Sequence, residues 1–431
     1  MKSFAAATIA ACASASTSNH WTVIMAGSNT YSNYRHQADS HHAVKIMLEN
    51  GIPRDQIIHM AYDDVANNRS NPFPGQLFNK PTAAGTPGVN VYDQSEIDYS
   101  GKEVNKSNFF KVLLGDSTAS GPVLGSDADS KVFVYFVDHG GAGLICTPQG
   151  SNDWIYADEL DSTLQSMKDT NMFKELVFYV EACESGSMFP NLDASENIFA
   201  MTASNATQSS WGAYCGSEAT IDGTNIGSCL GDLFSINWME DTESNDPSVE
   251  TLQTQYETVK TLTDRSPVLK FGDFSFMSEV IGDFEGVCDT DEASYTQRML
   301  HRANHIYKKV TDTREAPREL VDSRDHDLHY LYNRVMSGDK TAVPEMQAEL
   351  EHREFVDALF STHFEEAANA PENPQDFHCL RMMVGGVEEM CGPWSAYSLK
   401  YVRKLANACD TKTTEEISDL YVKVGEYCGA F

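Results

Sequence analysis

Short uninterrupted runs of apolar residues recur through the first two thirds of the chain. Residues 131–137 (KVFVYFV) and 176–180 (LVFYV) are too short for core helices and rich in β-branched and aromatic residues. Each run therefore predicts a strand buried on both faces. Further strands are predicted at 21–26, 56–61 and 198–204. Strands that alternate with helices predict an α/β fold with a parallel sheet and right-handed crossovers.

Amphipathic or punctuated segments separate these runs. They predict helices at 41–50, 106–114, 156–168, 231–240 and 249–262, and a strand-like stretch at 270–277. Residues 67–101 are rich in Pro, Gly and Asn, which predicts a surface loop carrying a short hairpin. Beyond about residue 289 the sheet-like runs stop, and charged segments such as 320–336 and 344–368 predict an all-helical remainder.

Polar residues follow two of the buried runs directly. Asp138, His139 and Gly140 come after residues 131–137, and Cys183 follows residues 176–180 closely. Because catalytic groups of open parallel sheets sit at the carboxyl ends of strands, His139 and Cys183 are expected to form a thiol/imidazole pair. Their spacing is close to the roughly 50 residues of the caspase-type arrangement.

A cysteine nucleophile needs a neighbouring base, because its thiol is mostly protonated at acidic to neutral pH. His139 can take that proton and later protonate a leaving amine. The backbone N–H groups of Gly140 and Cys183 are the expected oxyanion donors, since glycine lets backbone approach a substrate closely. The competing interpretation is a buried structural cysteine and an unrelated histidine at a strand end.

Four segments together resemble the legumains, the asparaginyl endopeptidase family of caspase-fold cysteine proteases. The segments are NYRHQAD at 33–39, YFVDHG at 135–140, EACESGSM at 181–188 and LGDLFSINWMEDTE at 230–243. The resemblance covers nearly the whole chain after the first twenty residues. It implies a caspase-like, mainly parallel sheet flanked by helices, followed by an all-α, disulfide-stapled prodomain that caps the active site.

The resemblance and the composition together divide the chain into five parts. One Lys and an alanine-rich run ending in ASA predict a signal peptide at 1–15. A short propeptide at 16–19, a catalytic domain at 20–288, an activation peptide at 289–341 and a helical prodomain at 342–431 then follow.

The resemblance also implies the residues that recognise the substrate. They are Arg35, His36, Glu181, Ser209 and Asp232, while Asn33 is expected to orient the catalytic histidine. The pocket suits asparagine because Arg35 can donate to the carboxamide oxygen and the carboxylates can accept from its NH2 group. Aspartate is expected to enter when protonated, so cleavage after it should be weaker and grow at low pH. An alternative is that Arg35 and Glu181 form a simple buried ion pair.

The cysteines indicate an oxidising compartment. Ten are present, and removal of Cys12 with the signal peptide leaves an odd number, so at least one thiol stays free, with Cys183 as the candidate. Four cysteines cluster near the C-terminus, and the sequence alone leaves their pairing open. The resemblance implies three bridges: Cys379 with Cys409, Cys391 with Cys428, and Cys215 with Cys229. Cys146 and Cys288 have no assigned partner.

The formal net charge of -32 argues against unaided binding of nucleic acid. It also makes an acid-triggered rearrangement plausible, since crowded carboxylates lose charge at low pH. No long apolar run predicts a transmembrane anchor. Asn-x-Ser/Thr sites at Asn68, Asn105 and Asn205 fit a secreted glycoprotein. The expected location is the secretory pathway, ending in a lysosome-like acidic vesicle or at the cell surface.

We therefore expect a cysteine endopeptidase that cleaves protein and peptide substrates after Asn, through a Cys183 thioester. It needs no cofactor and no metal, because the pair His301 and His305 lacks a carboxylate motif. The zymogen is expected to cut itself at Asn19, Asn304 or Asn333, and cystatin-type proteins are possible inhibitors. Two alternatives stay open: a peptide asparaginyl ligase using the same site, and a non-catalytic binding protein.

Overall fold

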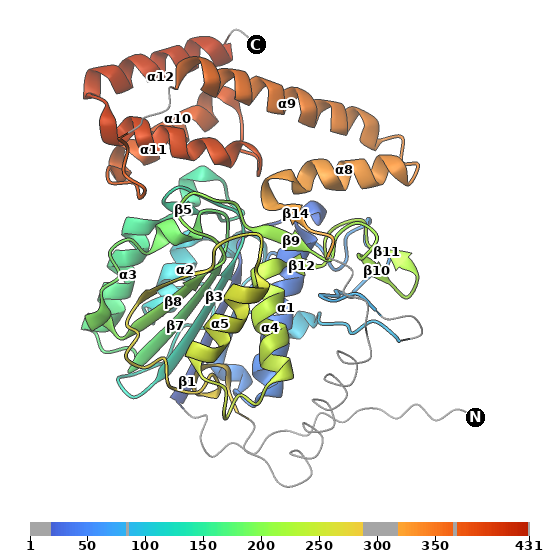
Figure 1. The fold of residues 1–431 in the computed structure, drawn as a ribbon, viewed down its shortest axis with the longest axis vertical. Coiled ribbons are helices and arrows are strands. Elements are labelled where there is room, and N and C mark those ends of the chain that lie inside the picture. The colour runs from blue at the N-terminus through green and yellow to red at the C-terminus, as the bar shows by residue number, and fades with distance from the viewer. Residues whose placement is uncertain (1–18, 83–85, 288–317, 365–368, 430–431) are drawn as a thin grey trace.

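A six-stranded sheet forms the centre of the molecule (Figure 1). The computed structural model describes residues 19–82, 86–287, 318–364 and 369–429. In sheet order the strands are β13 (Leu269–Gly272), β8 (Ile198–Thr202), β7 (Glu175–Glu181), β3 (Lys131–Val137), β1 (His20–Ala26) and β2 (Ile57–Met60). All neighbours pair in parallel except β13, which runs antiparallel to β8 at one edge. The predicted mainly parallel sheet is confirmed.

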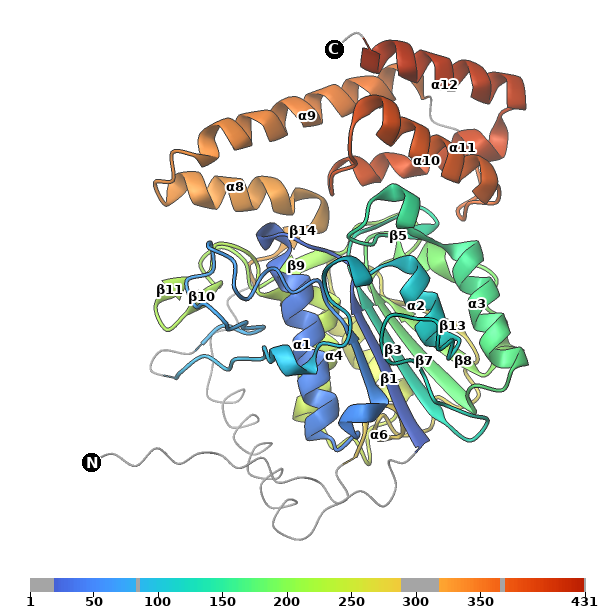
Figure 2. The ribbon, with the colours of Figure 1, turned by 180° about the vertical axis from the view of Figure 1, so that it is seen from behind.

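Alternate residues of β3 pack against helices on opposite faces of the sheet, as the two-residue period of a strand requires. Phe133 and Tyr135 belong to an apolar cluster with Trp238, whereas Val134 and Phe136 belong to a second cluster on the opposite face. The first face is covered by α1 (Tyr34–Glu49), α4 (Leu233–Ser244) and α5 (Leu252–Leu262). The second is covered by α2 (Lys106–Leu113) and α3 (Ala157–Asp169) (Figures 1 and 2). A short helix, α6 (Gly282–Glu285), follows the sheet.

Small antiparallel sheets carry the chain beyond the carboxyl ends of the central strands. One contains β4 (Gly140–Gly141), β5 (Leu144–Ile145) and β6 (Ile155–Tyr156). A second contains β12 (Gly231–Asp232), β9 (Trp211–Ala213) and β14 (Val321–Asp322). The hairpin of β10 (Thr220–Ile221) and β11 (Thr224–Asn225) lies within the loop closed by the Cys215–Cys229 disulfide.

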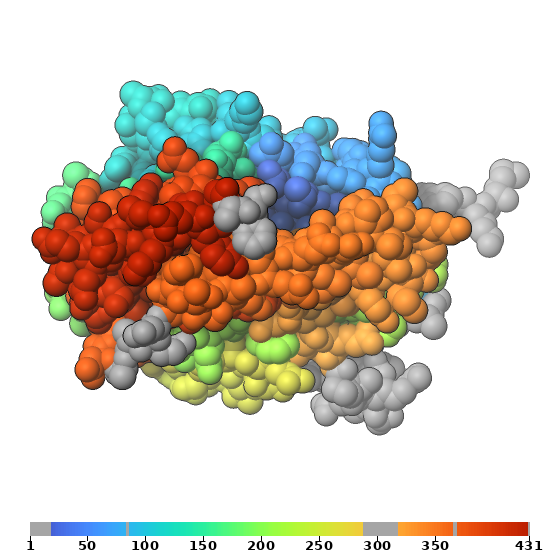
Figure 3. Space-filling model, turned by 90° about the horizontal axis from the view of Figure 1, so that it is seen from above, coloured from blue at the N-terminus to red at the C-terminus, as the bar shows by residue number. Residues whose placement is uncertain are grey.

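The C-terminal part is helical and lies over this same edge (Figures 1 and 3). Its helices are α8 (His326–Met336), α9 (Ala342–His363), α10 (Phe377–Cys391), α11 (Val402–Thr411) and α12 (Thr414–Gly429). The disulfides Cys379–Cys409 and Cys391–Cys428 link α10 to α11 and α12. Leu144 and Trp154 of the sheet domain join the apolar cluster of these helices, so the two parts share a buried contact.

Two expectations about local structure are wrong. Residues 320–336 do not form one helix, because Val321 and Asp322 pair with β9 as a strand before α8 begins. The described residues of 67–101 contain no hairpin. Their backbone is fixed largely by side-chain amides, as where Asn90 Oδ1 accepts from the Leu77 N–H at 2.9 Å. The first difference arises from a tertiary contact that local propensity does not report.

No helix within the described ranges combines the length and the apolar character that a membrane crossing requires.

Candidate active site

The two central strands bring His139 and Cys183 to the same edge of the sheet. The strands remain paired where they end, since the Asp138 N–H donates to the Glu181 carbonyl at 3.1 Å. The next residues also touch: a Cβ on Gly140 would lie 2.5 Å from the carbonyl oxygen of Cys183. Only glycine fits there, so the two candidate oxyanion donors belong to adjoining backbone.

The Cys183 thiol is fully buried and lies against Ser210. The Ser210 N–H donates to Sγ at 3.3 Å, and the Ser210 hydroxyl lies 3.7 Å from the same sulfur. Burial raises the pKa of Cys183, although the charge of Arg324 opposes this, so the thiol is protonated in this closed state. The neighbouring Ser209, which is predicted to contribute to the substrate pocket, is partly buried.

His139 contacts Asn33, the residue predicted to orient it. His139 Nε2 lies 2.8 Å from Asn33 Oδ1. The same oxygen also lies 3.4 Å from Arg35 Nη1, a donor, so it is an acceptor and Nε2 carries the proton. The other nitrogen, Nδ1, is buried without a hydrogen-bond partner among the described residues and is free to act as the base. Burial, with Arg35 and Arg324 adding to it, lowers the pKa of His139, so the ring is neutral.

The predicted pocket residues converge beside this pair. Arg35 Nε donates to Asp232 Oδ1 at 2.8 Å, and Glu181 Oε2 accepts from both the N–H and the hydroxyl of Ser235 at 2.9 Å. Three buried polar atoms of the set have no hydrogen-bond partner in the described chain: Arg35 Nη2, Glu181 Oε1 and Asp232 Oδ2. One unused donor and two unused acceptors therefore remain in the group, which is the complement of a carboxamide.

A third buried carboxyl, Asp39, supports the pocket. Asp39 Oδ2 accepts from the Asp232 N–H at 3.0 Å. Burial raises the pKa of Asp39, Glu181 and Asp232, and the charge of Arg35 opposes this rise at Glu181 and Asp232. The sequence analysis missed Asp39, although it ends the quoted motif NYRHQAD.

His36 lies behind the pocket and links it to the catalytic loop. Its Nδ1 is 2.7 Å from Ser28 Oγ and 3.4 Å from Asp138 Oδ1, and its Nε2 is 3.6 Å from Asp232 Oδ2. His36, Asp138 and His139 bring three potential metal-binding atoms within 4.8 Å of one another. A cation there would withdraw His139 from its role as base, and we assign none.

A segment of the C-terminal part crosses the site in extended form. Val321 of β14 lies opposite Gly212 of β9 in an antiparallel pair. The pairing continues as the Ser323 N–H donates to the Ser210 carbonyl at 3.0 Å, and the two hydroxyls lie 3.1 Å apart. Addition of a strand to an exposed sheet edge is a common way of binding an extended peptide. The chain thus pairs its own segment with β9 beside Ser210.

The side chains after Ser323 anchor this segment. Arg324 is buried, and its Nη2 donates to Glu184 Oε2 at 2.6 Å. His326 lies against Gly212 beside the pocket: a Cβ on Gly212 would lie 2.2 Å from His326 Nε2 and 3.4 Å from Arg35 Cδ. That imidazole nitrogen is buried and has no hydrogen-bond partner among the described residues. His326 therefore occupies space beside Arg35, and the sequence analysis did not foresee it.

The remaining predicted residues are dispersed. Asn19 is exposed just before β1, and Asn333 lies within α8 with its side chain 3.5 Å from the Gly227 carbonyl. Asn304 and Cys288 lie outside the described residues, as do the predicted signal peptide and propeptide up to residue 18. Cys146 is a buried free thiol.

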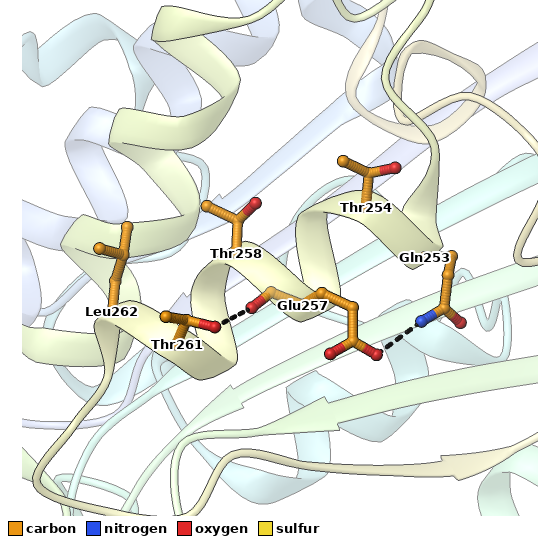
Figure 4. A pocket seen from close by; sticks show the side chains of 6 residues that line it. All are labelled: Gln253, Thr254, Glu257, Thr258, Thr261 and Leu262. Atoms are coloured by element: carbon orange, nitrogen blue, oxygen red, sulfur yellow. Dashed lines mark hydrogen bonds between the residues drawn. The ribbon is translucent and has the colours of Figure 1, made fainter.

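An open hollow on α5 lies apart from these groups, and none of the candidate site residues lines it. Figure 4 shows its side chains, which are Gln253, Thr254, Glu257, Thr258, Thr261 and Leu262. Gln253 Nε2 lies 2.8 Å from Glu257 Oε1 within the helix, and Gln253 Oε1 accepts from Lys270 Nζ of β13 at 3.2 Å. We assign no function to this hollow.

Known proteins resemble both parts of the chain. Residues 20–287 match the Peptidase C13 family, and residues 345–424 match the legumain prodomain. A vacuolar-processing enzyme beta-isozyme 1 from Oryza sativa subsp. indica is 35% identical, covering 92% of this chain and 82% of that protein. A legumain from Canavalia ensiformis is 32% identical, covering 95% of this chain and 89% of that protein. A crystal structure of caspase-1 from Spodoptera frugiperda superposes with a TM-score of 0.35 at 11% identity, covering 64% of this chain and 92% of that chain.

The family match spans the sheet domain together with its candidate thiol and imidazole, and the prodomain match falls on the disulfide-linked helices. This chain therefore belongs to the Peptidase C13 family, the legumain family of cysteine endopeptidases.

Proposed function

We propose that the protein is an asparagine-specific cysteine endopeptidase made as a zymogen. The observation that carries the specificity is the set of unpaired buried atoms at Arg35, Glu181 and Asp232. A P1 asparagine would accept from Arg35 Nη2 through its oxygen and donate through its NH2 group to the carboxylates. Side chains that lack half of this pattern leave buried polar atoms unpaired, which costs about 10⁴-fold or more in selectivity.

The reaction follows from the two strand-end groups. His139 Nδ1 takes the thiol proton as Sγ of Cys183 bonds to the scissile carbonyl carbon, and the resulting oxyanion is stabilised by the N–H groups of Gly140 and Cys183. The C–N bond then breaks, and His139 gives its proton to the departing amine. A water attacks the thioester, with His139 again accepting the proton, so the acid is released and the thiol returns. Asn33 keeps the proton on Nε2 throughout.

Aspartate is a weaker substrate in this proposal. Its carboxylate cannot donate to Glu181 or Asp232, and it brings a negative charge to a pocket that already contains three carboxyls. Once protonated, it offers one acceptor and one donor, as asparagine does. Cleavage after Asp should therefore rise as pH falls.

The C-terminal part acts as an intramolecular inhibitor in this proposal. The β14 strand takes the substrate position along β9, and His326 fills space beside Arg35. Activation would remove this segment after cleavage at Asn19 and Asn304, in an acidic compartment of the secretory pathway. Asn333 is a poorer candidate in this state, because a helical backbone does not fit an extended substrate groove.

Paired fluorogenic peptides test the proposal directly. We expect acid-treated protein to cleave after Asn, more slowly after Asp and not after Arg, and Cys183→Ala to abolish all turnover. Thr258→Ala, on the outer hollow of α5, is the matched control and should match the parent protein. Cleavage after Arg would overturn the pocket assignment, and turnover that persists in Cys183→Ala would overturn the nucleophile.

A further inference from the structure

A line of hydrogen bonds connects the specificity pocket to the surface through α1. It starts at Arg35 and Asp232, continues through Asp39 to Asn79, and ends at His42 and Glu243. The line is tightly packed where it enters the pocket, since a Cβ on Gly231 would lie 2.8 Å from both Asn79 Nδ2 and Asp39 Oδ1. Its inner members are fully buried, whereas the Glu243 side chain is 24% exposed.

The contacts of Asn79 define its orientation. Asn79 Nδ2 donates to Asp39 Oδ1 at 2.6 Å and to the Leu230 carbonyl at 2.9 Å, and both partners act as acceptors here. The opposite edge of the amide is therefore its oxygen. That oxygen lies 2.8 Å from His42 Nδ1, so this nitrogen must carry a proton.

The other nitrogen of His42 must carry a proton as well. His42 Nε2 lies 3.0 Å from Glu243 Oε1. Glutamate is ionised at neutral pH, and a carboxylate can only accept, so this nitrogen must donate. Both ring nitrogens face acceptors, and the arrangement as a whole requires the imidazolium form.

We propose that protonated His42 is a positioning residue of the specificity pocket, holding Asn79 and thereby the Asp39–Asp232 pair that fixes Arg35. This inference rests on the proposed asparagine specificity. A neutral imidazole carries one N–H, so loss of the proton forfeits either the Asn79 bond or the Glu243 bond. If the Asn79 bond is lost, the Asn79 side-chain amide that donates to Asp39 is no longer held by His42. If the Glu243 bond is lost, so is the charged pair that orients the ring.

Other charges surround His42 and influence how strongly its protonated form is favoured. Glu243 approaches from α4, Lys45 and Asp39 belong to α1 itself, and Lys80 follows Asn79 in the neighbouring loop. The lysines oppose a positive ring, whereas Glu243 favours it and is in direct contact. Lys80 is itself held by Glu240 at 3.2 Å, which reduces its influence on His42. Binding of the Asn side chain should accordingly depend on whether both ring nitrogens of His42 carry protons.

Glu243→Gln tests the proposal in the acid-activated enzyme, because it keeps an acceptor while removing the charge that favours the imidazolium. We expect the alkaline limb of kcat/KM for an Asn peptide to move down by about one pH unit, mainly through KM. The pH profile of Cys183 alkylation, which reports the thiol without the pocket, should not move. Glu257→Gln on α5 is the matched surface control and should leave both profiles unchanged.

The outcomes separate this inference from the proposed function. A parent enzyme that prefers Arg peptides overturns the pocket itself. An Asn-specific parent whose profile is unmoved by Glu243→Gln overturns the role of His42 alone, as does a parallel shift of the alkylation profile. Nitrogen-15 NMR of labelled histidines in the uncleaved Cys183→Ala protein gives a reading that needs no substrate. We expect N–H protons on both ring nitrogens of His42, and a single proton there would also overturn the proposal.

Discussion

The two surfaces that meet over the active site are stabilised in different ways. Beneath it, every residue from Val132 to Val137 is fully buried, and neighbouring strands on both sides bury their apolar runs equally well. Above it, α8 buries only His326, and α12 buries Ile417, Leu420 and Val424. Two disulfides hold this smaller part together.

This difference suits a zymogen. The sheet domain has an apolar cluster on each face of its sheet, and the buried members of both clusters are its own residues. The helices, in contrast, complete their apolar cluster with Leu144, Trp154 and other residues of the sheet domain. The prodomain is thus the part whose stability depends on contact with the other, and its removal should leave the geometry of the candidate active site intact.

The largest effect on activity is expected from a substitution in the specificity pocket of the sheet domain. Arg35→Met removes the only permanent cation among the buried carboxyls, and it leaves Asp232 without its charged partner. We expect kcat/KM for Asn peptides to fall by at least about 10³-fold, because buried polar groups are then unpaired both in the pocket and against the substrate. Steady-state kinetics measure the loss. Cys183 alkylation at an unchanged rate would show that the fold survives, and retained Asn selectivity would contradict the pocket.

The C-terminal helices should lose stability when one of their disulfides is removed. Cys391→Ser with Cys428→Ser opens a link between residues 37 positions apart. The free energy of unfolding of the helical part should fall by about 2–4 kcal/mol, through greater entropy of its unfolded chain. Calorimetry should show an earlier first transition with an unchanged sheet-domain transition. A uniform shift of both would mean that the two parts unfold as one unit.

His326 should set the acid dependence of opening. Burial, together with the charge of Arg35, lowers the pKa of His326 in the closed state, and release returns it to about 6.5. The stabilisation of the closed state is therefore complete above about pH 6.5 and is lost as pH falls below it. Glu184 acts in the opposite sense, since burial raises its pKa and protonation favours closure.

His326→Gln keeps a neutral polar side chain that cannot be protonated. We expect the midpoint of acid activation to move down by about one pH unit, equivalent to about 1.4 kcal/mol. Timed activation assays at graded pH, with the mature enzymes compared afterwards, measure this. An unchanged midpoint would assign the acid response to other groups.

The smallest effect should come from the outer face of α5. Thr258→Ala alters a side chain that lines the open hollow, away from the candidate active site. We expect a change of less than about 0.5 kcal/mol in the free energy of unfolding and none in kcat/KM. Thermal denaturation and peptide kinetics check both values, and a larger change would give this hollow a role.

Local patterns in the sequence predicted most of the strands and helices of the fold. The runs at β3 and β7 predicted adjacent parallel strands, because a stretch that is apolar on both faces has to be covered by helices on both sides. Polar residues directly after those runs placed His139 and Cys183 at one edge. The start of α8 was mispredicted, because residues 321–322 become a strand only through pairing with β9.

What the sequence determined by itself was the architecture and which candidate reacting groups it presents, since both follow from periodicity and from residues next to one another in the chain. Only the tertiary structure decided which groups surround them. Asp39, Asn79 and His42 meet Asp232 and Glu243 across long stretches of chain, and His326 reaches the pocket from another part. Such contacts depend on how helices and loops pack over the sheet edge. The pattern of neighbouring residues in the sequence does not show which distant segments will meet there.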